Sequence, residues 1–450
     1  MKTSILFSAL VLPPLLLAGC KGIAPPAERE ARKEVSAVRQ VYRPSDRRPD
    51  PSSLTAHSTL ADFVSFAMLN HPEAEAAYYD WTASVERITV ERSRPDPKLT
   101  FEMYLADAIT SLMPGLMVDL PGPGKLGVRA EAASAESRAK YFQFESSVLQ
   151  TAFAVKKAYY PLSFINEKIR INRLQLASLA DLEQLSRAKN RVGEAGLQDV
   201  LRAQIEQEKV RVEIGTLDHL RQLLRAQFKA ALGLTADQPD PPSPMPEKPA
   251  TENFDEEKLF AVAMASNPEL KKMKAEVQAA EAGIRMAQKE RVPDFTAGFE
   301  ADVKASPVIW NPQFSMTLPV WRDKLAAELA AAQANKRAAE DRLTAQQISL
   351  ALDFAERVHM VLETDLQLDS IRETQLPRAQ QSLDAIRGAY LPGQASFQDI
   401  IDAYRTFLGL QLDEIDMQTQ RETALAELSL IIGGIAPANA PLLKNPSKNP

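Results

Sequence analysis

The chain has 450 residues with a formal net charge of −6, and 45% of its residues are hydrophobic while 25% are charged. This composition is typical of a folded protein, and the mild acidity argues against a nucleic-acid-binding protein, which would carry a basic surface. Cys20 is the only cysteine, which excludes a disulfide within one chain.

Residues 1–19 are predicted to be a lipoprotein signal peptide. Lys2 precedes an apolar segment, and Leu17-Ala18-Gly19-Cys20 matches the bacterial lipobox, in which the cysteine thiol receives a diacylglycerol. The alternative is an ordinary secretory signal with a cysteine at its cleavage site by chance. Lys21 stands where an aspartate would indicate retention in the inner membrane, so the sequence favours a lipid anchor in the outer membrane.

Residues 20–58 are expected to form an extended tether between the lipid and the folded body. The segment contains Pro25, Pro26, Pro44, Pro49 and Pro51 among mixed charges. A short helix is predicted to follow, capped by Ser58 or Thr59.

Two pairs of short strands are predicted, at about 98–105 and 115–120 and again at about 294–304 and 312–319. In each, apolar and polar side chains alternate with period two, as Phe295, Ala297 and Phe299 do with Thr296 and Gly298. That period indicates a sheet with one apolar and one polar face.

Each strand pair precedes a pair of long helices. The first pair is predicted from Lys125 to about Arg191 and from Leu197 to Leu232, and a helix of about 67 residues is roughly 100 Å long. The second pair runs from Lys324 to about Ala389, interrupted only by Pro377, and from Phe397 to Ile432. A proline-rich connector, 234–254, separates the two sets, and 434–450 form a C-terminal tail.

The chain repeats itself at an offset of about 200 residues. Ala67-Met68-Leu69-Asn70-His71-Pro72-Glu73 recurs as Ala263-Met264-Ala265-Ser266-Asn267-Pro268-Glu269, and Gln198-Asp199-Val200-Leu201 recurs as Gln398-Asp399-Ile400-Ile401. Conserved order with a nearly constant offset indicates a duplication, with repeats at 59–233 and 255–433.

Four amphipathic strands in one chain imply oligomerisation if the strands enter a membrane. Strands of this length can span a bilayer, but an open sheet edge is not tolerated in lipid, and four strands are too few to close a barrel. Three copies would supply 12 strands, with Glu102, Glu300 and Asp302 lining a polar lumen. The long helices would form a hollow tube below it.

This plan resembles the TolC-like outer-membrane efflux proteins in their lipid-anchored branch. The carrying motifs are Asn70-His71-Pro72 with Asn267-Pro268, Leu120-Pro121-Gly122-Pro123-Gly124-Lys125-Leu126, Gly196-Leu197-Gln198-Asp199-Val200-Leu201, and Tyr390-Leu391-Pro392-Gly393-Gln394-Ala395-Ser396-Phe397-Gln398-Asp399-Ile400-Ile401-Asp402. The resemblance implies a mixed α+β membrane channel: a homotrimer with a 12-stranded β-barrel and a 12-helix periplasmic α-barrel. It further implies the exit duct of a tripartite pump, docked to a periplasmic adaptor and an inner-membrane transporter of the RND type, with no reaction catalysed.

The same resemblance implies a gate at the periplasmic end. Asp399 and Asp402 match the family's acidic aperture, although a solvated acidic face is the plainer interpretation of two nearby carboxylates. Tyr390 and Asp199 match positions that hold the closed state through a hydrogen bond. Ala395 stands where relatives carry an arginine of that lock.

Other functions remain as alternatives with less support. A lipid-anchored periplasmic adaptor would carry one helical hairpin rather than two, and a structural coiled-coil lipoprotein would not need alternating strands. The four histidines show no ligand spacing, so no metal site or cofactor other than the lipid on Cys20 is expected. The cargo is left open among metal cations, drugs and polypeptides.

Overall fold

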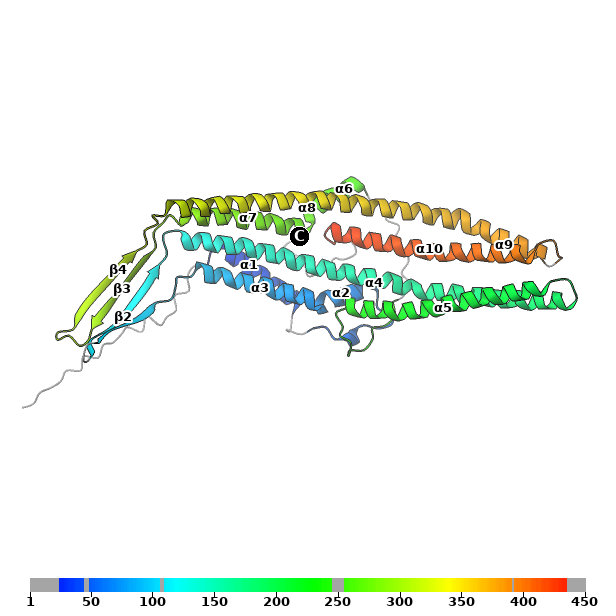
Figure 1. The fold of residues 1–450 in the computed structure, drawn as a ribbon, viewed down its shortest axis with the longest axis horizontal. Coiled ribbons are helices and arrows are strands. Elements are labelled where there is room, and N and C mark those ends of the chain that lie inside the picture. The colour runs from blue at the N-terminus through cyan, green and yellow to red at the C-terminus, as the bar shows by residue number, and fades with distance from the viewer. Residues whose placement is uncertain (1–23, 44–47, 106–108, 245–254, 391, 435–450) are drawn as a thin grey trace, which may run out of the picture.

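The computed structural model describes residues 24–43, 48–105, 109–244, 255–390 and 392–434. The molecule is elongated. Helices run along most of its length, and a four-stranded sheet projects from one end (Figure 1). The first half contains α1 (Pro26–Tyr42), α2 (Leu60–Asn70), α3 (Pro72–Arg92), β1 (Lys98–Leu105), β2 (Ile109–Leu120), α4 (Lys125–Arg191) and α5 (Leu197–Ala231). The second contains α6 (Glu256–Ser266), α7 (Pro268–Lys289), β3 (Phe295–Asp302), β4 (Ile309–Met316), α8 (Arg322–Ser370), a π turn (Ile371–Gln375), α9 (Leu376–Tyr390) and α10 (Phe397–Ile431).

Helix α4 is the central element of the helical part. It contacts α3 and α7 near the sheet and α5 and α10 further along, while α8 packs on α7 and α10. Both long hairpins, α4–α5 and α9–α10, therefore extend in the same direction, away from the strands (Figure 1). Pro161 lies inside α4 without ending it, so the predicted long helix is confirmed.

The four strands form one antiparallel sheet in the order β1-β2-β3-β4. Strands β2 and β3 join the two halves, with Gly115 opposite Glu300 and Met117 opposite Gly298. The expected strand boundaries were partly wrong. β2 starts at Ile109, which pairs with Leu105 of β1. β4 ends at Met316, three residues before Pro319, which has no N–H for a ladder.

The corner between strand β2 and helix α4 is built by the glycine-rich motif found in the sequence. Gly124 has a φ of 83°, and a Cβ on Gly122 would lie 2.5 Å from the carbonyl oxygen of Pro293. Buried Lys125 pairs with Asp294 at 2.9 Å, and Asp294 also accepts the Gly122 N–H at 2.7 Å. The motif thus fixes the first half against the second where the sheet meets the helices.

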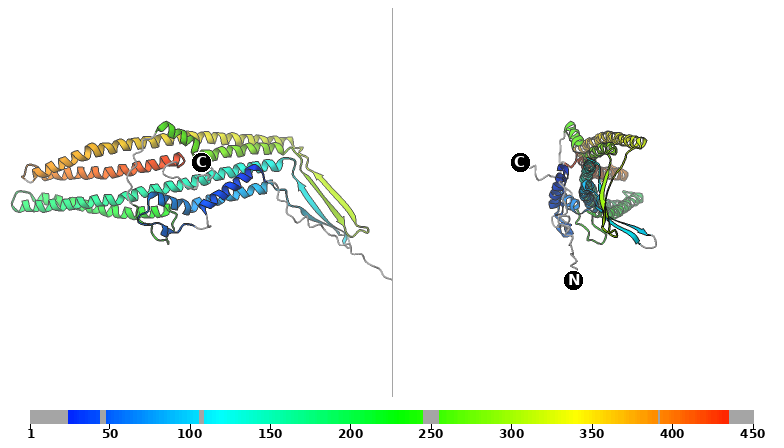
Figure 2. Two further views of the ribbon diagram at one scale, coloured as in Figure 1. Left: turned by 180° about the vertical axis from the view of Figure 1, so that it is seen from behind. Right: turned by 90° about the vertical axis from the view of Figure 1, so that its left-hand side faces the viewer.

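The expected tether is wrong over residues 26–42, which form α1. This helix lies at one flank of the helical layer (Figure 2). Pro25 is its N-cap, and Pro26 occupies the first turn, where proline favours helix initiation. Glu28 is only 1% exposed and binds Arg92 and Thr89 of α3. Burial opposes ionisation of Glu28, but hydrogen bonds from Arg92, Thr89 and Arg32 lower its pKa to about 2.

The main core lies in the first half, between α2, α3, α4 and α5. It is rich in aromatic side chains, and Trp81 is stacked on Phe144 with 6.0 Å between the ring centroids. Phe63 packs edge-on to Phe228 at 5.1 Å, so the core joins the start of this half to its end. A separate cluster at the far end of the helices joins both hairpins and includes Leu182, Leu383 and Ile401.

Candidate functional site

The sheet has one mainly polar face, which also carries Met113 and Met117, and one apolar face. From the pairing register, one face carries Lys98, Thr100, Glu102, Ser111, Asp119, Thr296, Glu300, Asp302, Asn311 and Gln313. The opposite face exposes Leu99, Phe101, Met103, Phe299, Trp310, Phe314 and Met316. An exposed apolar sheet face of this size requires an apolar surrounding or a partner.

The polar face is organised as hydrogen-bonded rows that cross the strands. Asp119 accepts from Lys98 at 2.6 Å and from Thr296 at 2.8 Å. Ser111 donates to Asp302 at 2.7 Å. Glu102, Glu300 and Asp302 all lie on this face, and Glu102 is exposed.

Glu300 differs from the other two acids because only 3% of it is exposed. Its carboxylate lies over Gly115, where an added Cβ would be 2.3 Å from the Glu300 Cγ. Thr100 and Gln313 donate to the two carboxylate oxygens at 3.2 and 2.6 Å. Glu300 therefore joins strands β1, β3 and β4 along the wall instead of projecting from it.

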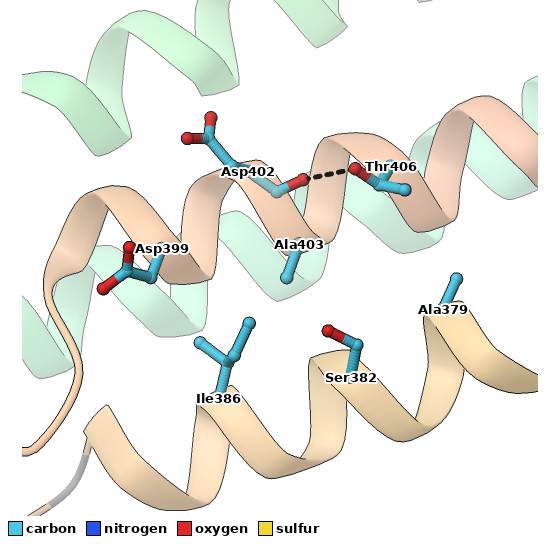
Figure 3. A pocket seen from close by; sticks show the side chains of 7 residues that line it. All are labelled: Ala379, Ser382, Ile386, Asp399, Asp402, Ala403 and Thr406. Carbon is cyan, nitrogen blue, oxygen red and sulfur yellow. Dashed lines mark hydrogen bonds between the residues drawn. The ribbon is translucent and has the colours of Figure 1, made fainter.

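At the other end of the molecule, the predicted aperture acids lie on the first turns of α10 (Figure 3). Together with Ala379, Ser382 and Ile386 of α9 they line a hollow of about 300 Å³. Asp399 closes a capping box with Ser396, whose N–H and hydroxyl donate to it at 2.9 and 2.7 Å. These bonds lower the pKa of Asp399, so its carboxylate is ionised at neutral pH.

Asp402 is held by a different set of partners. Gln398 donates to both carboxylate oxygens at 3.0 Å, and Arg405 donates at 3.2 Å. Arg405 also makes two hydrogen bonds to Glu206 of α5, at 2.6 and 3.1 Å. Of the two carboxylates proposed for the aperture, the Asp402 carboxylate is therefore paired with a neighbouring cation, Arg405.

The expected hydrogen bond between Asp199 and Tyr390 is not formed within the described residues. The Tyr390 hydroxyl instead lies 3.2 Å from the hydroxyl of Ser186 on α4. Lys189 donates to the Tyr390 carbonyl at 2.8 Å and lies 4.8 Å from the centre of its ring. Burial raises the pKa of Tyr390, the Ser186 bond lowers it, and the nearby charge of Asp199 raises it.

Sequence reasoning missed Ser186, Lys189, Glu206 and Arg405, which make the contacts between the hairpins. For Lys189 the sequence did contain a signal: it lies four residues before Gly193, and a cation in the last turn of a helix interacts favourably with the helix dipole. The pairing of Arg405 with Glu206, 199 residues apart, had no local signature.

Cys20 lies outside the described residues, so its predicted lipidation is not addressed by the geometry. Among the residues that are described, no cluster of three or more His, Cys, Asp and Glu side chains is arranged to hold a metal ion. In the same part of the chain, no helix is both long and apolar enough to cross a membrane.

Comparisons with known proteins agree with the fold. Residues 259–434 match the family model "Outer membrane efflux protein". The cobalt-zinc-cadmium resistance protein CzcC of Cupriavidus metallidurans is 23% identical over 282 residues, which cover 60% of this chain and 66% of that protein. A membrane protein from Pseudomonas aeruginosa superposes with a TM-score of 0.74 at 18% identity, covering 86% of this chain and 92% of that one. The Campylobacter jejuni CmeC outer membrane channel gives 0.72 at 13% identity, covering 85% and 88%.

These matches define a class, the TolC-like outer-membrane efflux channels. The fold of this chain is the fold of that class, and residues 259–434, in its second half, carry the match to the family model. The predicted fold class is confirmed, and the comparisons support the predicted function of an outer-membrane efflux channel.

Proposed function

We propose that three copies of this chain close into one duct, which crosses the outer membrane of a Gram-negative bacterium and continues into the periplasm. The observation that carries the proposal is the single sheet with an exposed apolar face and two free edges, β1 and β4. Lipid does not tolerate free edges. Pairing β4 of one copy with β1 of the next removes all of them and gives the 12-stranded barrel.

The helices support the same assembly. Helix α8 exposes Ile348, Leu352, Leu362 and Leu366, and α5 exposes Leu197, Leu201, Ile205, Val212 and Leu223. These residues recur at helical spacing along one side of each helix. Among the described residues α5 packs mainly on α4, and α8 packs mainly on α7 and α10, so head-to-tail packing of α8 on the next copy's α5 would close the ring.

The duct would serve as the exit of a tripartite pump. Members of this family form trimers that act with an adaptor and an inner-membrane pump. For this chain we propose a periplasmic adaptor at the helical tips and an RND-type transporter behind it. A lipid on Cys20 would add an anchor in the outer membrane.

Metal cations are the cargo that the site favours. The carboxylates of Asp399 and Asp402, repeated three times around the axis, would attract cations and repel anions, with Asp399 contributing most because Asp402 is paired with Arg405. The resemblance to a protein named for cobalt, zinc and cadmium resistance points the same way. Drugs and polypeptides remain the competing cargoes.

Planar-bilayer conductance of the detergent-purified trimer tests the duct and its aperture together. We expect stepwise, cation-preferring channels whose selectivity falls in the double variant Asp399→Ala/Asp402→Ala. Unchanged selectivity in the variant would move the constriction elsewhere, and a monomeric protein without channels would contradict the shared barrel. Mass spectrometry of the mature N-terminus, with Cys20→Ser as control, tests the lipid.

A further inference from the structure

The two hairpins of the sheet repeat each other pair for pair. In the first hairpin Glu102 lies opposite Met113, and in the second Glu300 lies opposite Asn311. Each residue of the second pair follows its counterpart in the first by 198 positions. The same offset relates every pair of β1 and β2, from Lys98–Met117 to Tyr104–Ser111, to a pair of β3 and β4. The register of the ladder is therefore the same in both halves.

This equality extends to the two outer strands of the sheet, β1 and β4. In the proposed barrel β4 of one copy lies next to β1 of the next copy, and this junction is the repeat counterpart of the junction between β2 and β3. In that inner junction Gly115 lies opposite Glu300. The same offset, applied forwards to β2 and backwards to β3, places Gln313 opposite Glu102 of the next copy.

The alternation of side chains supports this register. Phe314 and Phe101 of the next copy then lie opposite each other on the apolar face, and both are mostly exposed in the single copy. On the polar face Ser315 lies opposite Thr100 of the next copy. A slip by one residue would place the apolar face of one copy beside the polar face of the other, so only slips of two residues compete with this register.

One position of the junction differs in a way that changes its chemistry. Gly115 has no side chain, and an added Cβ there would lie 2.3 Å from the Cγ of Glu300. Glu300 can therefore lie flat over β2, where only 3% of it remains exposed. The counterpart of Gly115 is Gln313, whose side chain fills this space. Glu102 of the next copy must therefore meet the Gln313 side chain and cannot lie over the β4 backbone.

Gln313 has the hydrogen-bonding capacity for this second carboxylate. Its amide donates to Glu300 of the same copy at 2.6 Å. A primary amide carries two N–H donors, and the second meets no acceptor within the part of the chain that the structure describes. Glu102 is exposed and makes no hydrogen bond among the same residues. Glu300 and Glu102 of the next copy would stand two strands apart, at about 10 Å, on either side of Gln313.

We propose that Gln313 joins neighbouring copies on the lumen side of the barrel. Its amide donates to Glu300 of its own copy and to Glu102 of the next copy, with β4 and β1 paired in the register that places Gln313 opposite Glu102. The inference rests on the proposed duct and specifies how its copies meet. Glu102 is then held in the wall between two copies and is not a free charge of the lumen.

Disulfide crosslinking of the full-length purified trimer tests the register. Phe314→Cys with Phe101→Cys should form a covalent trimer under mild oxidation, because directly opposite Cα atoms lie about 4.5–5.5 Å apart, within reach of a disulfide. Phe314→Cys with Leu99→Cys, or with Met103→Cys, should crosslink at least ten-fold less. In these pairs the cysteines are diagonal neighbours, about 7–8 Å apart.

The position of the two strands supplies the control for crosslinking. Within one copy β1 and β4 are separated by β2 and β3, or about 14 Å, so a disulfide between them can only join two copies. Phe314→Cys alone and Phe101→Cys alone, which both keep Cys20, should give no covalent trimer.

A double-mutant cycle tests the role of Gln313. Gln313→Ala and Glu102→Ala should each lower the temperature at which the trimer dissociates in detergent. The combined variant should fall little further, because each change already removes the same bond. Ser315→Ala, on the same face of β4, is the matched control, and its effect should add to that of Glu102→Ala. Channels of the Glu102→Ala variant should keep their cation preference, and a marked loss of it would make Glu102 a lumen charge and contradict the proposal.

The outcomes separate this inference from the duct itself. Conducting trimers that crosslink only in a shifted pair would overturn the register and leave the duct intact. Additive effects of Gln313→Ala and Glu102→Ala in conducting trimers would overturn the bridge by Gln313. A protein that crosslinks in none of the three pairs would overturn the closure of β4 on β1 and, with it, the proposed barrel.

Discussion

The two halves of the chain have the same order of helices and strands, but they bury different amounts of apolar surface. The first half has a large aromatic core, and α1 covers part of it. The equivalent cluster in the second half is small, with Ala263, Phe354, Val358, Leu428 and Ile432 as its buried members. Helix α8 also leaves a row of leucine and isoleucine side chains exposed, with Leu366 73% accessible.

This difference shows that the two copies of a duplication can keep the same topology while burying their apolar side chains in different ways. The first half supplies most of its own hydrophobic stabilisation. The second half leaves apolar surface that, in the proposed trimer, a neighbouring copy covers. Substitutions in the second half are therefore expected to affect assembly, and those in the first half the stability of each copy.

The largest effect is expected for Leu352→Lys combined with Leu366→Lys on α8. Both side chains are exposed in the single copy, so folding should be retained, but placing two charges in the proposed interface should abolish the trimer. Light scattering after size exclusion measures the mass, and circular dichroism checks the helix content. Ser349→Lys, an exposed polar position on the same helix, is the control. A trimer that survives the double change would show that this side of α8 faces solvent.

The next effect concerns the core of the first half. Trp81 is 1% exposed and contacts Tyr78, Tyr141 and Phe144. Trp81→Ala should destabilise the protein by about 3–5 kcal/mol, because an aromatic side chain is removed from a packed site. Exposed Tyr79→Ala should cost less than about 1 kcal/mol. Thermal unfolding followed by circular dichroism ranks the two, and similar losses would contradict the assignment of the core.

Several features of the fold were predictable because they depend on local pattern. Alternation predicted the strands, and long stretches rich in alanine and leucine, with Pro161 as the one proline in the first, predicted α4 and α10. The helix at 26–42 was not predicted, because the prolines on either side of it indicate an extended segment and outweigh the helix-forming residues between them. The bond between Glu28 and Arg92 that holds this helix connects residues 64 positions apart, and no local pattern shows it.

The functional residues were predictable to a smaller extent. Asp399 and Asp402 lie together on α10, where the motif placed them, but their different partners depend on Ser396 and Arg405. The Tyr390 hydroxyl contacts Ser186 instead of Asp199. Whether Ser186 of α4 or Asp199 of α5 faces Tyr390 depends on how each helix is rotated about its own axis. A sequence motif does not contain that information.

The two halves also differ in how they tie the start of a helix to the end of the repeat. In the second half, Asn267 caps α7 by accepting from the N–H groups of Glu269 and Leu270 and donates to the carbonyl of Ile431. In the first half, His71 caps α3 and Asn70 donates to Leu232. Asn267→Ala should therefore cost about 2–3 kcal/mol, the sum of a cap and a buried hydrogen bond. His71→Ala should cost about 0.5–1 kcal/mol. Thermal unfolding compares them, and equal losses would show that the roles are not divided in this way.

The smallest effect is a pH dependence that only the first half should show. Burial lowers the pKa of His71 below its usual value of 6.5, although the charge of Glu73 raises it, and the neutral ring accepts the Glu73 N–H at 3.3 Å. The unfolded chain therefore binds the proton more readily than the folded one, so stability should be present above pH 6.5 and decline as the pH falls below it. Thermal unfolding at pH 7.5 and 5.5 measures the change. His71→Asn, which copies the cap of the second half, should reduce the change, whereas His57→Asn at an exposed loop should not. If the unmodified protein and both variants show the same pH dependence, groups other than His71 cause it, and the two caps do not differ in this respect.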